Sequence, residues 1–150
     1  MAERRSLIFN TPDDVAAEVK RLRDGGYEKA GQWNLPQVCF HCEKLLVQAM
    51  TGPAADTTPE QTARRPILDQ MLATNRIPDG IVSPDPAVPP ADTPASAVDD
   101  FLKTLDAFEA FTGTFAPHRL FGNISPQERR RHQMIHCAHH LSYLVPAKDC

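Results

Sequence analysis

The sequence predicts an all-α protein, a four-helix bundle with a long proline-rich loop before its third main helix. Apolar residues recur at intervals of three and four in several segments of the 150-residue chain, as they do on the buried face of a helix. Two of these segments open with Thr-Pro or Ser-Pro, which is typical of a helix start. No segment alternates apolar and polar residues as a half-buried strand would. Length and composition suit a single domain over residues 1–150.

The first two helices have recognisable ends. Thr11 is placed to cap a helix whose first residue is Pro12, and Gly25-Gly26 ends it. Its apolar stripe consists of Val15, Val19 and Leu22. A second helix is expected over residues 35–50, closed by Thr51-Gly52-Pro53.

A proline-rich segment separates the first half of the chain from the second. A shorter helix is expected over residues 60–74, where Pro66 breaks the helix or shifts its start. Residues 76–95 then hold six prolines, which exclude helix and disfavour strand. Within so short a chain this segment is predicted to be a packed strap or lid rather than a domain linker.

Two further helices follow the proline-rich segment. Helical spacing returns at Ser96, and Gly113 stops it; the apolar residues are Phe101, Leu102, Leu105, Phe108 and Phe111. The last helix is expected to begin at Ser125-Pro126, where Glu128 completes a capping box, and to run to about Leu144.

Charge and composition exclude several classes of partner. A net charge of −3 gives no electrostatic reason to expect nucleic acid or an anionic membrane. The basic run Arg129-Arg130-Arg131 is interpreted as a solvated helix face. No apolar stretch is long enough to span a bilayer, and no secretory signal follows the N-terminus. We therefore expect a cytoplasmic protein whose cysteines are reduced.

The most informative feature is a histidine cluster near the C-terminus. Four of the six histidines, His132, His136, His139 and His140, fall within nine residues of the last predicted helix. Residues four apart project from the same side of a helix, so two of these imidazoles can bind one metal ion. Such a pair needs a third ligand from elsewhere.

His41 is the best candidate for that third ligand. It lies one turn from Val38 and Leu45, at the border of the apolar stripe of the second helix. Glu43 is a weaker candidate because it projects elsewhere. A competing interpretation joins Cys39 and Cys42 to two of the histidines as a Cys2His2 site, but the two halves lie far apart in the sequence.

These histidines resemble a known family. His41 together with the His136-x-x-His139-His140 run is similar to the DinB/YfiT-like metalloenzymes. Residues 118–141 also resemble an uncharacterised DinB-related subfamily, through the motif His118-x-x-Phe121-Gly122-x-Ile124-Ser125-Pro126-x-Glu128 and the histidines that follow it. The resemblance covers residues 7–145 in element order, with its specific motifs in residues 30–45 and 118–141.

The resemblance implies a bound divalent metal ion. The implied ligands are His41, His136 and His140, with zinc or nickel expected ahead of iron or copper. A His132/His136 pair is the alternative. With His41, His136 and His140 as the ligands, His139 would be a surface residue, a cleft wall or a group that orients a ligand. His118 would line the cleft mouth, or cap the last helix or pack, and capping or packing is expected ahead of the cleft mouth.

The family also implies a class of reaction. Members with known activities use such a site for chemistry with low-molecular-weight thiols. We therefore expect a metal-dependent thiol S-transferase or a hydrolase-like enzyme acting on a small thiol or electrophile, with residues 76–95 roofing the pocket. Tyr143 and His139 are neighbours with suitable protons, but no general base is evident. The alternative is a non-catalytic, metal-braced bundle acting as a dimeric stress or interaction protein, and a homodimer is expected.

Overall fold

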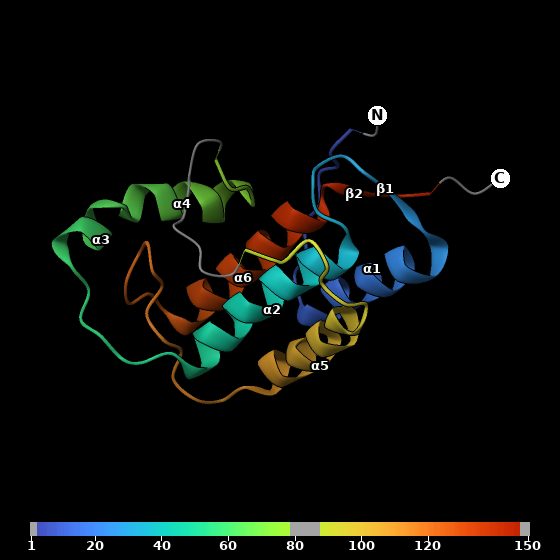
Figure 1. Ribbon diagram of the computed structural model, residues 1–150. Coiled ribbons are helices and arrows are strands. Elements are labelled where there is room, and N and C mark those ends of the chain that lie inside the picture. The colour runs from blue at the N-terminus through green and yellow to red at the C-terminus, as the bar shows by residue number, and fades with distance from the viewer. Residues whose placement is uncertain (1–2, 79–87, 148–150) are drawn as a thin grey trace.

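The computed structural model describes residues 3–78 and 88–147, most of which lie in helices (Figure 1). The elements in chain order are α1 (Pro12–Gly25), β1 (Tyr27–Lys29), α2 (Leu35–Thr51), α3 (Pro59–Ala63), α4 (Arg65–Thr74), α5 (Ser96–Ala110), α6 (Pro126–Leu141) and β2 (Leu144–Pro146). The predominance of helix agrees with the predicted class. Within these ranges no helix is both long and apolar enough to cross a bilayer.

Capping boxes set the starts of four helices. At each of them the side chain of the capping residue accepts from the third helical N–H, and the third residue accepts from the backbone of the cap. The pairs are Thr11 with Asp14, Asn34 with Gln37, Thr58 with Gln61, and Ser125 with Glu128. The boxes satisfy N–H groups that a helix start leaves unpaired, so the starts at residues 12 and 126 follow from the local sequence as predicted.

The helix expected over residues 60–74 is broken near Pro66, as predicted: it is divided into α3 and α4 at Arg64, and Pro66 lies in the first turn of α4. The structure corrects two other predicted boundaries. α5 ends at Ala110, before Gly113. α6 ends at Leu141, because the residues after it turn into a strand.

That strand is part of a small sheet that was not predicted. β2 pairs antiparallel with β1, with Tyr27 opposite Pro146 and Lys29 opposite Leu144. Each strand has three residues, which is too short for alternation to appear in the sequence. Within the proline-rich segment, residues 76–78 and 88–95 form neither helix nor strand, and residues 79–87 lie outside the described ranges.

The four longer helices enclose the main core. α2 packs against α5 and α6, and α1 packs against α5 and α6 (Figure 1). The largest side chains in this core are Phe101, Phe108, Leu22, Leu46, Leu105 and Leu141. A second, smaller cluster consists of Leu68, Met71 and Phe121, where α4 contacts α6 and the loop before it. Figure 1 shows α3 and α4 as an arm beside the α2–α6 pair.

Candidate metal centre

Two contacts fix how α2 and α6 face each other. The Nε2 atoms of His41 and His136 lie 3.1 Å apart, and Arg129 Nη2 donates to Gln48 Oε1 at 3.0 Å. Gln48 lies seven residues after His41 on α2, whereas Arg129 lies seven residues before His136 on α6, so the two helices run antiparallel. The two contacts are therefore separated by about two helical turns on each helix.

Three histidines converge near the C-terminal end of α6. His136 Nε2 lies 3.1 Å from His41 Nε2 and 3.1 Å from His140 Nε2. One nitrogen from each ring lies within 4.8 Å of the others, and over residues 3–78 and 88–147 this is the only such group of histidine, cysteine or acidic side chains. His41 is 3% exposed and His136 is 9% exposed. The structure thus brings together the three residues that the resemblance implied as ligands.

The donor set fits a divalent cation. Two nitrogens bound to zinc at about 2.0–2.1 Å are roughly 3.3 Å apart in a tetrahedral site, close to the two observed separations. Without an ion, a single N–H between two rings cannot satisfy both contacts of His136 Nε2. One cation accepts all three lone pairs at once.

Burial keeps the imidazoles of His136 and His140 neutral. Desolvation is the main cause that lowers the pKa of His136 well below its ordinary value, and the neighbouring His140 and His41 lower it further. The pKa of His140 is lowered in the same way, first by burial and then by His41. Because a metal binds the neutral imidazole, the lone pairs are available at neutral pH.

The three histidines form part of the wall of a cavity of about 370 Å³. Its wall draws on α2, α4 and α6, on the loop at residues 118–120, and on Ile77 and Val88 at either edge of the undescribed part of the proline-rich segment. A cavity of this size suits a small molecule. Metal sites that react with substrates keep an open position, whereas structural sites are closed, so the cavity matters for the chemistry.

Trp33 covers the histidines from the side of β1 and α2, and it was not identified from the sequence. Its ring stacks on His140 at 5.3 Å between centroids and is tilted against His41 at 5.0 Å. Trp33 lies just before the α2 cap, where no periodicity marks a residue as buried or functional. Only the tertiary structure places it at the site.

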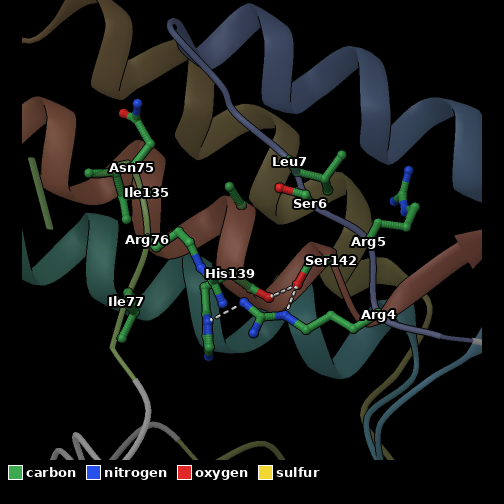
Figure 2. A pocket seen from close by; sticks show the side chains of 11 residues that line it. Arg4, Arg5, Ser6, Leu7, Asn75, Arg76, Ile77, Ile135, His139 and Ser142 are labelled. Carbon is green, nitrogen blue, oxygen red and sulfur yellow. Dashed lines mark hydrogen bonds between the residues drawn. The ribbon is translucent and has the colours of Figure 1, made fainter. Parts of the chain in front are cut away.

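His139 lies outside the three-histidine group, and its ring packs edge-on against the His140 ring at 5.0 Å between centroids. Figure 2 shows Arg4 reaching both His139 and Ser142. The Arg4 guanidinium donates to His139 Nδ1 at 2.8 Å, which places the proton of a neutral His139 ring on Nε2. These residues line a small pocket of about 200 Å³, which Figure 2 shows. His139 lines both this pocket and the larger cavity beside the three histidines. Its role as a cleft wall is what the sequence suggested.

His132 and His118 also line the cavity. His132 is 5% exposed, contacts the His118 and Phe121 rings, and lies outside the three-histidine group. His118 Nδ1 accepts from the Leu120 N–H at 3.0 Å, so it packs within its loop and does not cap α6. Burial lowers the pKa of both, that of His132 to about 3.

The cysteine alternative is not assembled. Cys39, Cys42 and Cys137 are buried thiols of the main core, and burial raises the pKa of the Cys39 thiol. A thiol held protonated is a poor metal ligand. Glu43 lies elsewhere, accepting from Thr104 Oγ1 at 3.4 Å and facing Lys44.

The interpretation of the arginine run as a solvated face was wrong for two of its three residues. Arg129 is 2% exposed, and Arg130 is half-buried and donates to the Phe108 and Phe111 carbonyls. Arg131 is exposed and donates to the Leu72 carbonyl. α6 is buried on nearly every side, so a run of like charges does not mark its solvent face.

Comparison with known proteins identifies a family whose function is unknown. A family model described as a protein of unknown function (DUF1569) matches residues 1–147. No curated protein and no solved structure matches this chain. What the site does therefore has to be argued from its own geometry.

Proposed function

This chain belongs to the DUF1569 family of proteins of unknown function, and we propose that it binds a divalent metal ion through His41, His136 and His140 and acts as a metal-dependent enzyme. One observation carries the proposal: three imidazole nitrogens converge in the wall of a cavity of about 370 Å³. A site that only braced two helices would be expected to be closed. The cavity therefore favours catalysis over the metal-braced, dimeric interaction protein.

Each residue of the site would have a distinct role. His41, His136 and His140 would each supply an imidazole lone pair, and Trp33 covers two of their rings. When bound, the metal would supply Lewis acidity that makes a coordinated water or thiol nucleophilic near neutral pH. Leu45 and Met71 in the cavity wall would limit the water around the reacting group.

The reaction class rests on the resemblance to the DinB/YfiT-like metalloenzymes. On that ground we assign a four-helix bundle of that type, zinc or nickel as the metal, and transfer of a low-molecular-weight thiol to an electrophile. In that reaction a carbon–sulfur bond forms, the bond to the leaving group breaks, and the thiol proton goes to solvent. No acidic side chain lines the described part of the cavity wall, so no carboxylate there would act as base.

The metal is tested first. Elemental mass spectrometry on protein purified without an affinity tag or added metal should find about one zinc or nickel per chain. The His136→Ala/His140→Ala double variant should lose it while its circular dichroism stays helical. His139→Ala is a matched control on the same helix, and it should keep the metal. If no ion binds the wild type even when zinc, nickel, iron and copper are each supplied, the metal proposal is wrong.

The reaction is tested second, on the metal-loaded protein. Consumption of a haloalkyl electrophile would be followed with a panel of low-molecular-weight thiols, with the double variant as the control. Thiol-dependent turnover that the variant lacks would support the transferase. A metal-loaded protein that consumes none of the thiols but hydrolyses an ester would move the assignment to a hydrolase-like enzyme.

A further inference from the structure

The cavity has a second polar end, two helical turns from the histidines. Gln48 lies seven residues after His41 on α2, and Arg129 lies seven residues before His136 on α6. These two side chains meet through the Arg129–Gln48 hydrogen bond, as His41 and His136 meet at the other end. At about 1.5 Å of rise per residue the two ends are roughly 10.5 Å apart along the helices. All four residues line the cavity.

Arg129 is a buried cation without a carboxylate partner. Its Nε donates to the Ala116 carbonyl at 3.1 Å and its Nη2 to Gln48, while Nη1 has no partner among the residues that the structure describes. No ion pair joins Arg129 to an acid of residues 3–78 or 88–147. Burial lowers its pKa to about 10, so it stays charged at neutral pH. Buried charges are normally paired, because an unpaired one is strongly unfavourable.

Other unsatisfied polar atoms surround the same space. Five buried side-chain atoms in the described ranges lack a hydrogen-bond partner, and four of them belong to residues that line this cavity. Those four are Arg129 Nη1, His132 Nδ1, Gln133 Oε1 and His136 Nδ1. Buried polar atoms are nearly always satisfied. Their concentration in residues of α6 that line the cavity leaves unmet hydrogen-bonding capacity beside this space.

Between the two ends, the wall formed by α2 and the α4 arm is apolar, whereas His132 and Gln133 line the α6 side. Leu45 lies between His41 and Gln48 on α2, and Met71, Ile77 and Leu120 line the side of the α4 arm. Neutral His118 and His132 add no charge, and the other cation in the lining, Arg119, is exposed. The interior therefore matches one negative charge and an apolar body.

We propose that Arg129 is the anion-binding end of the cavity, and that the substrate is an elongated molecule with a carboxylate at Arg129, an apolar middle, and its reacting group beside the three histidines. The position of the reacting group rests on the proposed function; the carboxylate end does not. A single charge–charge hydrogen bond in a desolvated site is expected to favour a carboxylate over a neutral group by roughly tenfold or more.

The carboxylate end is tested on protein freed of metal with a chelator. The Arg129 Nε–H resonance, assigned through its contact with Ala116 in ¹⁵N-labelled protein, would be followed while hexanoate is added. We expect the shift to saturate with hexanoate. Hexanol should bind with at least tenfold lower affinity, and acetate should bind weakly because it lacks the apolar body. No shift with hexanoate overturns the proposal. Equal binding of acetate, inorganic phosphate and hexanoate overturns the elongated substrate.

The reacting end is tested separately with cobalt-loaded protein. 6-Mercaptohexanoate should produce a thiolate-to-cobalt charge-transfer band at lower concentration than 6-mercaptohexanol, and Arg129→Gln should abolish that difference while the band remains. Arg131→Gln, at an exposed position on the same helix, should preserve the difference. A band with equal affinity for both thiols in the wild type contradicts the carboxylate end. Absence of any band contradicts the metal proposal alone, since the resonance of Arg129 is read without metal.

Discussion

At the scale of single residues, the same side chain has three different roles within one stretch of α6. His136 and His140 face His41, His132 faces the His118 and Phe121 rings, and His139 is held by Arg4. His132 and His140 each lie four residues from His136, so helix spacing allows either pair. The tertiary structure decides between them, because His41 lies beside His136 and His140; the His136/His140 pair, and not His132/His136, therefore forms the group with His41.

Metal-induced stabilisation should distinguish these histidines. An ion that binds only the folded chain stabilises it by about 2.7 kcal/mol at a hundred times its dissociation constant. Addition of zinc to chelator-treated wild type should raise the thermal unfolding midpoint by several degrees. His41→Gln should lose this rise, whereas His132→Leu should keep it. A rise of equal size in His41→Gln would show that the ion binds elsewhere.

Trp33 offers an optical measure of the same event. It is the one tryptophan of the chain, and its ring stacks on His140 and tilts against His41. Paramagnetic nickel or copper held by these histidines should quench its fluorescence, with saturation at one ion per chain. The His136→Ala/His140→Ala variant should show no saturable quenching. Fluorescence unaffected by an ion that mass spectrometry finds bound would contradict binding at this site.

The sequence identified part of the site for a physical reason. Spacing along one helix is local information, so the sequence itself limited the pair to His136 with His140 or His132 with His136, and the border position of His41 suggested that it points inward. Arg129 and Trp33 could not be found in the same way. Whether an arginine is buried, or which ring a tryptophan covers, depends on elements distant in the chain.

At the scale of elements, helix starts were predictable and helix ends were less so. A capping box is formed within four consecutive residues, as at Ser125–Glu128. The end of α6 at Leu141 instead depends on the pairing of β2 with β1, more than a hundred residues earlier in the chain. Local sequence signals cannot report such a pairing, which is why α6 was predicted too long.

The loop before α6 should tolerate substitution poorly at Gly122. Its φ is +72°, and a Cβ there would lie 2.5 Å from Thr57 Cγ2. We expect Gly122→Ala to lower the free energy of unfolding by about 1–2 kcal/mol or more, from the left-handed backbone and the clash together. Gly25→Ala is the control, because nothing lies within 4 Å of the added Cβ. Urea unfolding of both variants tests this, and equal stabilities would contradict it.

At the scale of the whole molecule, the cavity exists because two packing units meet. α1, α2, α5 and α6 enclose the main core, and the α3–α4 arm is held to the α6 region by Arg65 with Glu128, by Arg131 with the Leu72 carbonyl, and by Asn123 with Thr57. Apolar periodicity predicts which residues are buried, but not the space left between two clusters. The helical fold class could therefore be predicted from the sequence, whereas the Arg129–Gln48 end of the cavity could not.

Stability of the metal-free protein should fall as the solution becomes mildly acidic. Burial lowers the pKa values of His118, His132, His136 and His140, so the folded chain keeps them neutral while the unfolded chain gains protons below about pH 6.5. The unfolded state then binds more protons, and the free energy of unfolding decreases with falling pH. Glu128, whose pKa is lowered to about 2, adds the same sign of effect only near and below pH 4.5.

Urea unfolding in the presence of a chelator measures this loss. Between pH 7.5 and 5.5 each such histidine should contribute about 1.4 kcal/mol, so the four together should cost several kcal/mol. His132→Leu removes one titrating group from the interior and should reduce the pH dependence by about a quarter. A stability independent of pH over this range would mean that the folded protein accepts protons on these rings. The histidine cluster would then have to open to water before it binds any ion.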